Sequence, residues 1–494
     1  MVGQIKSLDA LGLTAQGSRK VDVTGLAVDS REVKDGYLFA ALPGTRVHGG
    51  EFIQYALRMG AGAILTDAEG ARIAFEELAE SEAALIIAED PRQTLAYAAA
   101  LWFGAQPEVM VAVTGTNGKT SVASFCRQIW SELGLDAINL GTTGVEGAYA
   151  APLAHTTPEP ITLHRVLAEA EAAGVTHAAM EASSHGLAQR RLDGVTIAAA
   201  GFTNFTQDHL DYHTDFEDYF AAKAGLFARV LPEDGTAVIN IDDARGTDVL
   251  AIARARGQRL VTVGRSDGAD LHLQAQRFEA TGQRLRFTWL GEVHQMKLDL
   301  IGGFQGENLL LAAGLCIGAG ADPDRVFETL HRMKTVRGRM QLAATRENGA
   351  AVFVDYAHTP DAVATALKAL RPHVMGRLIA IVGAGGDRDP GKRPLMGQAA
   401  AENADLVIVT DDNPRSEDPA LIREAVMQGC PDATNVGDRA EAILRGVDAL
   451  GPGDALLISG KGHETGQIVG DDVLPFDDSE QASVAVAALD GGLA

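Results

Sequence analysis

The residues from Gly115 to Ser121 have the types and spacing that bind a polyphosphate. Glycines let backbone N–H groups turn toward an anion, Lys119 can meet the outer phosphates, and the Thr120 hydroxyl suits a Mg²⁺ ligand. The full P-loop pattern has a glycine at the position of Val113, so this is a shortened variant. The alternative is a glycine-rich turn that only caps a helix. The candidate nucleotide-binding residues are Gly115, Thr116, Asn117, Gly118, Lys119, Thr120 and Ser121.

The elements that must position this run are a buried strand and an amphipathic helix. Val109–Val113 is continuously apolar, as a strand covered on both faces should be. Downstream, apolar residues recur at helical spacing until Gly134, where we expect the helix to end: Val122, Phe125, Cys126, Ile129, Trp130 and Leu133. Because strand, Gly-Lys-Thr and helix follow in this order, phosphate binding is the favoured interpretation.

Acidic and histidine side chains follow two further predicted strands. Glu181 ends a strand candidate at 176–180, and a carboxylate at that end beside a P-loop is well placed to hold Mg²⁺ directly or through water. The run Asn204–His213, which includes His209, is dense in His and Asp and indicates a second metal position. Histidines of this kind are also often hydrogen-bonded structural residues, so that alternative stays open.

Lys223 lies on the aromatic face of a helix expected to begin near Phe216. Burial lowers the pKa of an ammonium group, and a neutral amine can take up CO₂ as a carbamate, which would turn a cation into a Mg²⁺-binding carboxylate. The alternative is a lysine that covers apolar surface while its head reaches water. From the residues alone, this alternative is favoured.

The last 155 or so residues repeat one theme three times, an apolar strand followed by a charged, glycine-containing loop. The strands are predicted at Leu378–Val382, Leu406–Val409 and Ala455–Ser459. In an open parallel sheet such loops meet at the carboxyl edge, where ligands bind. Each loop alone could be a solvated connection, but three together predict a site.

Two more side chains complete an ATP site. Arg337 lies in a predicted hinge, Arg337–Arg339, where domain closure would bring a fixed positive charge onto a transferring phosphoryl group. Asp355 ends another predicted strand and could accept a hydrogen bond from a ribose hydroxyl.

The pattern of strands and helices predicts an α/β protein of three domains. Residues 1–90 are expected to form a small N-terminal α/β domain, 91–338 a central P-loop domain with a mostly parallel sheet, and 339–494 a C-terminal Rossmann-like domain. Alternating polarity around Arg284–Trp289 predicts antiparallel hairpins added to the central sheet.

Composition narrows the class of protein. The 494 residues carry 42 basic and 66 acidic side chains and a net charge of -24, which opposes binding to nucleic acid or to anionic membranes. Three separated cysteines fit a reducing cytosol and argue against a zinc site or a disulfide framework. We find neither a signal peptide nor an 18-residue apolar span, and we expect a cytoplasmic monomer.

Taken together, these motifs resemble the Mur ligases, the ATP-dependent peptide synthetases of peptidoglycan precursor synthesis, over essentially the whole chain. The matching order comprises the P-loop, Glu181 to His185, Asp208 to His213, Lys223, Asn308, Arg337 and Asp355 to His358. The Asp412–Arg415 motif, Asp-Asn-Pro-Arg, resembles that of the members that add meso-2,6-diaminopimelate to UDP-N-acetylmuramoyl-L-alanyl-D-glutamate.

The resemblance implies a role for each matching residue. ATP would contact the P-loop, Asn308, Arg337 and Asp355, with Lys119, Arg337 and Lys223 as catalytic residues; Mg²⁺ would be held by Thr120, Glu181, His209 and a carbamylated Lys223, which reverses the interpretation favoured above. In the UDP-muramoyl dipeptide, the uridine nucleotide would contact Val28, Ser30 and the loop Thr45, Arg46 and Val47, and the muramoyl dipeptide portion would contact Thr156, Thr157, Ser183, Gln189 and Arg191. Diaminopimelate would contact Arg388, Asp412, Asn413, Pro414, Arg415, Gly460 and Glu464.

The chemistry of the last group agrees with these roles. Diaminopimelate carries a second carboxylate and amine, which a guanidinium and an acid can bind, and Arg415 and Glu464 supply both. The implied reaction passes through an acyl phosphate and supports cell-wall growth and division. Asp412–Arg415 speaks against a lysine-adding synthetase or a folylpolyglutamate synthase, and a nucleotide switch would not need such a pocket. One departure is Gln305, where the family often has asparagine near the adenine.

Overall fold

The computed structural model describes residues 4–44, 47–206 and 212–491. The chain divides into two compact units, residues 1–263 with 311–326, and residues 264–310 with 327–494. The boundary between the units falls within helix α10 (Phe304–Gly318). The division into domains 1–90, 91–338 and 339–494 stays a prediction. The mixed α/β class is confirmed.

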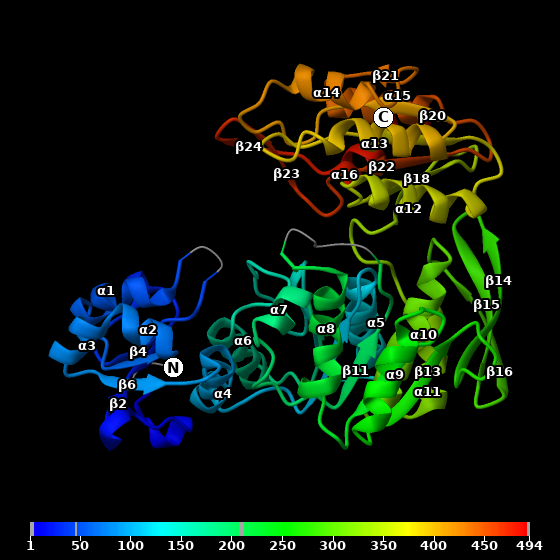
Figure 1. Ribbon diagram of the computed structural model, residues 1–494. Coiled ribbons are helices and arrows are strands. Elements are labelled where there is room, and N and C mark those ends of the chain that lie inside the picture. The colour runs from blue at the N-terminus through cyan, green and yellow to red at the C-terminus, as the bar shows by residue number, and fades with distance from the viewer. Residues whose placement is uncertain (1–3, 45–46, 207–211, 492–494) are drawn as a thin grey trace. The chain divides into compact units, whose positions relative to one another are not determined.

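The N-terminal part of the first unit is a four-stranded parallel sheet in chain order (Figure 1). Its strands are β3 (Gly25–Ala27), β4 (Tyr37–Ala40), β5 (Ala63–Thr66) and β6 (Ala84–Ile87), beside a small antiparallel pair, β1 (Lys6–Ser7) and β2 (Asp22–Val23). The helices are α1 (Ile53–Arg58), α2 (Ala68–Ile73), α3 (Phe75–Glu80) and α4 (Pro91–Phe103). Apolar residues of α1 and α4 belong to two separate buried clusters that share the sheet, so both faces are covered.

The rest of the first unit is built on seven strands in the order β13-β12-β11-β7-β10-β8-β9. Pairings are parallel except between β8 and β9. The strands are β7 (Val109–Thr114), β8 (Ala137–Gly141), β9 (Gly144–Gly147), β10 (His177–Glu181), β11 (Ala199–Phe202), β12 (Thr236–Asn240) and β13 (Arg259–Gly264). Because β7 is flanked by β10 and β11, its carboxyl end, and with it the P-loop, lies in the middle of the sheet.

Helices cover both faces of these strands. One face packs against α6 (Pro160–Ala172), α7 (Ser184–Ala188), α8 (Phe216–Gly225) and α9 (Gly246–Ala255) in a single apolar cluster. A π-helical segment, Leu226–Val230, follows α8 directly. Helix α5 (Lys119–Glu132) contacts β8 and β10, and Gly134 follows it with φ of 80°, the left-handed end predicted from the sequence.

The second unit begins with the predicted antiparallel hairpins. They are β14 (Leu271–Glu279), β15 (Gly282–Trp289) and β16 (Glu292–Leu298), paired in chain order. Helix α11 (Pro323–Thr329) also crosses the boundary between the units.

His373 connects the end of β14 to the residues before α10. Its Nδ1 lies 2.7 Å from the Glu279 carbonyl oxygen, and its Nε2 accepts from Gly302 N–H at 3.0 Å.

The C-terminal part of the second unit is a six-stranded sheet in the order β17-β18-β22-β19-β20-β21 (Figure 1). All pairings are parallel except that of β17 with β18. The strands are β17 (Gln341–Thr345), β18 (Ala351–Asp355), β19 (Leu378–Val382), β20 (Leu406–Val409), β21 (Thr434–Asn435) and β22 (Ala455–Ser459). The bounds predicted for β19, β20 and β22 are confirmed.

Alternate residues of these strands face two different helix layers. One cluster contains α12 (Pro360–Leu370), α13 (Lys392–Asn403) and α14 (Pro419–Met427), and the other contains α15 (Arg439–Asp448) and α16 (Asp478–Leu489). This is the doubly wound arrangement predicted for the C-terminal region. A separate hairpin, β23 (Gly466–Val469) and β24 (Asp472–Pro475), follows β22.

Candidate active site

The P-loop begins at Gly115, whose backbone conformation only glycine adopts readily. Its φ is 146°, and a methyl group at its Cα would overlap the Thr203 hydroxyl and lie 3.0 Å from the Asn204 carbonyl oxygen. Asn204 also holds the next two residues, because its carbonyl accepts from Thr116 N–H and its side-chain oxygen from Asn117 N–H, both at 2.9 Å. The loop is therefore fixed by Asn204, two residues after the end of β11, a contact that the local sequence does not predict.

The P-loop ends at the amino terminus of α5, where no side chain caps the helix. Uncapped N–H groups and the helix dipole at such an end favour an anion. The Lys119 ammonium donates to the carbonyl oxygens of Gly115 and Thr116 at 2.9 Å each, so the cation lies over the loop that it is predicted to serve.

Glu181 is hydrogen-bonded both to the P-loop and to a residue predicted to hold the muramoyl dipeptide. Its carboxylate is buried and accepts from the Thr120 hydroxyl at 3.0 Å and from Thr142 N–H at 2.9 Å. Gly141 at the end of β8 makes room for it, since a side chain there would overlap the carboxylate. The structure thus brings together two predicted Mg²⁺ ligands, Thr120 and Glu181.

The five residues predicted to hold the muramoyl dipeptide form one hydrogen-bonded group. The Thr157 hydroxyl donates to the Glu181 carbonyl at 2.9 Å and accepts from Ser183 N–H at 3.0 Å. Arg191 donates to the Thr157 carbonyl at 2.5 Å and to the Gln189 side chain at 2.7 Å. Thr156 joins through Thr142, with the two hydroxyl oxygens 3.1 Å apart.

Lys223 of α8 is buried at 1% exposure, so the water-reaching alternative is wrong. Its ammonium donates to the Gly115 carbonyl at 2.7 Å and lies 4.6 Å from the centre of the Tyr219 ring. The Tyr219 hydroxyl is 3.2 Å from that of Thr116, which ties the same helix to the P-loop. Carbamylation of Lys223 stays a prediction, and His209 lies outside the described residues.

A cavity of about 810 Å³ in the first unit is lined by residues 88–94 together with Pro43, Asp67 and Arg190. Its walls include two guanidinium groups, those of Arg92 and Arg190. Arg92 donates to the Pro43 carbonyl, and Arg190 donates to Asp90 at 2.8 Å. Among the predicted uridine contacts, Val28 and Ser30 are half-buried and Val47 is exposed, whereas Thr45 and Arg46 lie outside the described residues.

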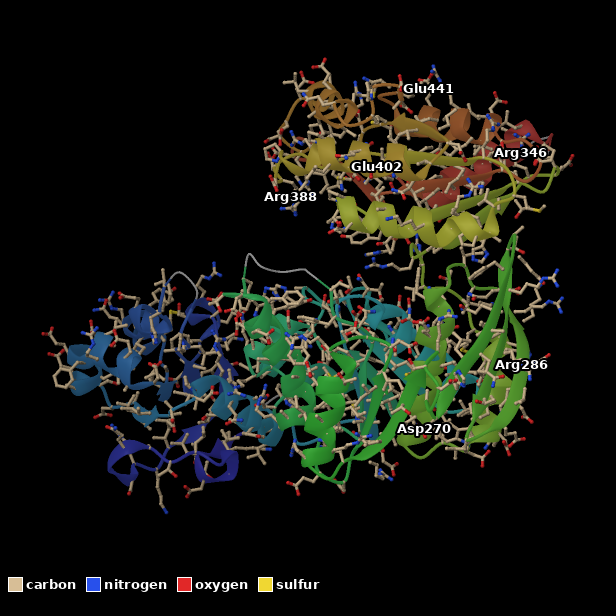
Figure 2. All side chains as sticks on the ribbon, turned by 45° about the vertical axis from the view of Figure 1, so that its right-hand side comes forward. Asp270, Arg286, Arg346, Arg388, Glu402 and Glu441 are labelled. Carbon is tan, nitrogen blue, oxygen red and sulfur yellow. The ribbon has the colours of Figure 1, made fainter. Side chains whose placement is uncertain are left out.

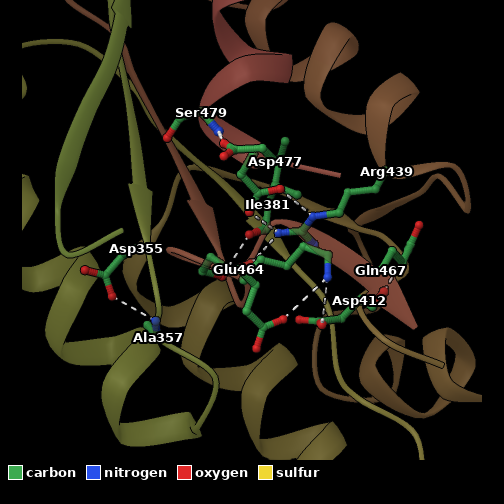
Figure 3. Close-up of polar contacts among 12 residues, drawn as sticks. Asp355, Ala357, Ile381, Asp412, Arg439, Glu464, Gln467, Asp477 and Ser479 are labelled. Carbon is green, nitrogen blue, oxygen red and sulfur yellow. Dashed lines mark hydrogen bonds and ion pairs between the residues drawn. The ribbon is translucent and has the colours of Figure 1, made fainter. Parts of the chain in front are cut away.

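The second unit contains the other three predicted ATP contacts. Asn308 is buried, and its side-chain amide donates to the Gln305 side chain at 3.2 Å. Asp355 accepts from the N–H groups of Met340 and Ala357 at 2.7 and 2.8 Å, and its surroundings raise the pKa of its carboxyl through desolvation (Figure 3). Arg337 is exposed and pairs with Asp477.

The loops after β19, β20 and β22 meet at the carboxyl edge of the second unit's sheet. Gly386 N–H donates to the Asn413 carbonyl at 2.9 Å, and the Arg415 guanidinium donates to the Gly386 carbonyl at 2.7 Å. Asn413 donates from its side-chain amide to Glu464 at 2.9 Å. The predicted convergence of three strand-end loops is confirmed.

A glycine and several charged side chains surround Asp412 at this edge of the sheet. Gly460 has φ of 116°, and a side chain there would overlap the Asp412 carboxylate. Burial raises the pKa of Asp412, an effect that nearby Arg439 opposes. Asp412, Glu464 and Arg439 lie close together (Figure 3), whereas Arg388 is exposed at the rim of the unit (Figure 2).

The described residues contain oxygen ligands that fit Mg²⁺ but no complete protein cage for a metal. Within 4–44, 47–206 and 212–491, no three His, Cys, Asp or Glu side chains gather closely enough to hold an ion. Mg²⁺ commonly binds one or two carboxylates together with phosphate oxygens and water. The adjacent Glu181 carboxylate and Thr120 hydroxyl match that chemistry.

Comparison with known proteins shows to which family this architecture belongs. Three family descriptions match the chain: "Mur ligase family, catalytic domain" over residues 22–102, "Mur ligase middle domain" over 113–316, and "Mur ligase, glutamate ligase domain" over 338–462. A relative from Bradyrhizobium diazoefficiens is 48% identical over 474 residues, 95% of this chain and 96% of its own. The chain belongs to the Mur ligase family.

Two of the related Mur ligases have the same name. A protein from Caulobacter vibrioides is also 48% identical, over 475 residues that cover 95% of this chain and 96% of the relative. It and the Bradyrhizobium protein are both "UDP-N-acetylmuramoyl-L-alanyl-D-glutamate--2,6-diaminopimelate ligase". A solved structure with that name in its title superposes with a TM-score of 0.74 at 33% identity, covering 98% of this chain and 99% of the other. No helix in the described part of this Mur ligase has the length and apolar character needed to cross a membrane.

Some contacts of this Mur ligase were not predicted from the sequence. Thr142 N–H donates to Glu181, and Asn204, which begins the run predicted as a second metal position, accepts from the P-loop; only the packed sheet creates these contacts. Lys461 and Arg439 are fully buried cations beside the Asp412–Arg415 loop. Lys461 lies in the charged, glycine-containing loop predicted after Ala455–Ser459, so its sequence neighbours were a usable signal.

Proposed function

We propose that this chain is the ATP-dependent ligase that adds meso-2,6-diaminopimelate to UDP-N-acetylmuramoyl-L-alanyl-D-glutamate. The names of relatives 48% identical over nearly the whole chain support this substrate pair. The observation that carries the proposal is the convergence of a fixed guanidinium, Arg415, and two acidic side chains, Asp412 and Glu464, at one sheet edge.

The charges at that edge suit an amino acid with a second amine and carboxylate. A guanidinium binds a carboxylate through paired hydrogen bonds, and carboxylates bind an ammonium group. Lysine has no second carboxylate, so binding lysine would leave the Arg415 charge without its partner, which costs affinity. We therefore propose Arg388, Asp412, Asn413, Pro414, Arg415, Gly460 and Glu464 as the diaminopimelate contacts.

The first chemical step uses the P-loop and its neighbours. The side-chain carboxylate of D-glutamate attacks the γ-phosphorus of ATP, the bond to the bridging oxygen breaks, and ADP leaves an acyl phosphate behind. Lys119 stabilises charge on the phosphoryl oxygens, and Arg337 is proposed to do the same, a task of positioning and electrostatics. The contacts from Thr120 through Glu181 to Thr142 and Thr157 support this, because they join the phosphate loop to the proposed dipeptide group.

The second step forms the amide bond. An unprotonated amine of diaminopimelate attacks the acyl carbon, a tetrahedral intermediate forms, and inorganic phosphate leaves with its electron pair while the amine loses a proton. The oxygen that joined carbon to phosphorus departs with the phosphate. One carboxylate oxygen of the glutamate is therefore expected in the released phosphate.

Mg²⁺ and a carbamate on Lys223 belong to the same proposal. Thr120, Glu181 and His209 would hold Mg²⁺, which would neutralise charge on the phosphates. Burial of Lys223 against Tyr219 and the Gly115 carbonyl supports a special role for this lysine. Activity that is the same in CO₂-depleted and bicarbonate-supplemented buffer, and in Lys223→Ala, would remove the carbamate from the proposal.

A product assay tests the function. The purified chain, the muramoyl dipeptide nucleotide, ATP and Mg²⁺ are incubated with diaminopimelate, lysine or ornithine, and products are separated by mass. We expect amide formation and phosphate release only with diaminopimelate, and ¹⁸O transfer from labelled glutamyl carboxylate to phosphate. Phosphate release that needs neither substrate would instead favour a nucleotide switch.

Arg415→Ala tests the proposed selectivity. Because it removes the guanidinium proposed to bind the second carboxylate, binding should weaken by about 2–5 kcal/mol for diaminopimelate, whereas lysine, which lacks that carboxylate, should bind no worse than to the wild type. A variant that still discriminates fully would place the selective pocket elsewhere.

A further inference from the structure

Lys461 is a completely buried lysine in the loop between β22 and β23. Its exposure is 0%, and its ammonium donates to the Asn413 side-chain oxygen at 2.8 Å and to the Gly466 carbonyl at 2.7 Å. The same group lies 3.6 Å from a Glu464 oxygen and 4.0 Å from an Asp412 oxygen. A buried ammonium is retained only where such partners compensate its desolvation.

These contacts determine which way the Asn413 amide points. Its oxygen accepts from Lys461 and, at 2.9 Å, from Ile468 N–H, so the amide nitrogen must face the other side. There it donates to Glu464 at 2.9 Å. Reversing the amide would oppose its N–H₂ group to two donors, which costs the hydrogen bonds of all three groups.

Lys461 also ties hairpin β23–β24 to the Asp412–Arg415 loop. Lys461 donates to the Gly466 carbonyl at the start of β23, and the next residue, Gln467, donates from its side chain to the Asp412 carbonyl at 2.7 Å. Arg415 N–H donates to the Ile468 carbonyl at 3.1 Å, and Arg415 itself has a left-handed φ of 51°. The hairpin is thereby held against the loop that carries the proposed selective guanidinium.

The charges of the surrounding network favour a cationic ligand. Lys461 and Arg439 face three carboxylates, those of Asp412, Glu464 and Asp478, which leaves one negative charge in excess. Arg439 and Asp478 are paired through two hydrogen bonds of 2.7 Å, so the excess falls on the acidic pair next to Lys461.

We infer that Lys461 is a positioning residue for the amino-acid substrate, which orients Asn413 and Glu464 toward the ammonium end of that substrate and does not touch it. This inference rests on the proposed function and adds a residue to it. Loss of Lys461 should weaken binding of the amino acid while leaving the two nucleotide substrates unaffected.

The test compares Lys461→Met, which keeps length but removes charge and donors, with Lys368→Met, a matched change at an exposed lysine of α12. Lys461→Gln is the second variant, because it keeps a donor. We expect the KM for diaminopimelate to rise about tenfold or more in Lys461→Met, as for loss of a hydrogen bond made by a charged group. The KM values for ATP and the UDP substrate should stay within about twofold of the wild type, and Lys461→Gln should be intermediate.

The outcomes distinguish failure of the proposed function from failure of the positioning role of Lys461. No product from diaminopimelate with the wild-type chain refutes the proposed function, and the role of Lys461 with it. If the wild type is active, equal rises in all three KM values, or an unchanged KM for diaminopimelate, overturn the positioning role alone. Circular dichroism and thermal unfolding identify the folded variants; failure of both Lys461 variants to fold would make this lysine a core residue and also overturn the inference.

Discussion

His164 of α6 is expected to make the first unit less stable in acid. The side chain is 2% exposed, and its Nε2 has no hydrogen-bond partner among the described residues. Burial disfavours the imidazolium form and lowers the pKa of His164 from 6.5 to about 4. Between those two pH values the unfolded chain therefore binds a proton that the folded chain rejects.

The sign and size of the effect follow from proton linkage. Above pH 6.5 the histidine is neutral in both states and has no influence on the pH dependence of stability. As pH falls from 6.5 to 4 the free energy of unfolding decreases, by about 2 kcal/mol at pH 5 and by about 3.4 kcal/mol once pH is below 4, where the loss levels off.

The assay isolates the first unit. Trp102 and Trp130 lie in it and Trp289 does not, so urea unfolding followed by fluorescence in a Trp289→Phe background reports on that unit. We expect the decrease in unfolding free energy from pH 7.5 to 5 to be about 2 kcal/mol smaller in His164→Leu than in the background chain. His155→Asn, at an exposed histidine, is the control and should leave the difference unchanged. Equal pH dependence in His164→Leu and its background would refute the reasoning.

Three further predictions concern the sites. Gly115→Ala should abolish ATP binding in isothermal titration, since the new methyl group overlaps a neighbouring threonine hydroxyl; wild-type affinity would contradict this. Asp478→Asn should cost about 3–5 kcal/mol in chemical unfolding because Arg439 is left buried without its counter-charge, whereas Glu441→Gln, in an exposed ion pair, should cost below about 1 kcal/mol. Glu181→Gln should lower kcat by about 10²–10³ and raise the Mg²⁺ concentration needed for half-maximal rate, while thermal unfolding stays unchanged. An unaltered dependence of the rate on Mg²⁺ would exclude a metal-binding role for Glu181.

Local sequence predicted the elements because each one depends on neighbours in the chain. The apolar run of β7, the helical spacing of α5 and the glycine after it are signals within a few residues of the structure they describe. Strand bounds moved by one or two residues where pairing with a neighbouring strand decided the end: β10 includes Glu181, since its register with β7 extends to Val113. Such pairing partners are remote in sequence.

Contacts between remote segments decided the rest of the candidate site. The residue types at 223 left two environments open for this lysine, and its burial against the P-loop follows from the packing of α8 onto that loop. Similarly, the orientation of Asn413 depends on Lys461 and Ile468, from a loop and a hairpin about 50 residues away. A sequence pattern names groups that can do chemistry, but hydrogen-bond direction and desolvation exist only once the sheets bring those groups together.

Sequence alone thus determined that this chain carries a P-loop, an α/β architecture and a Mur ligase's order of motifs, because residue type and short spacing encode them. Tertiary structure decided which of those residues touch: Glu181 with Thr120 and Thr142, and Asn413 with Lys461 and Glu464. The physical reason is that parallel strands set their carboxyl ends side by side whatever their separation in the chain, so the neighbours of each loop are known only from strand order.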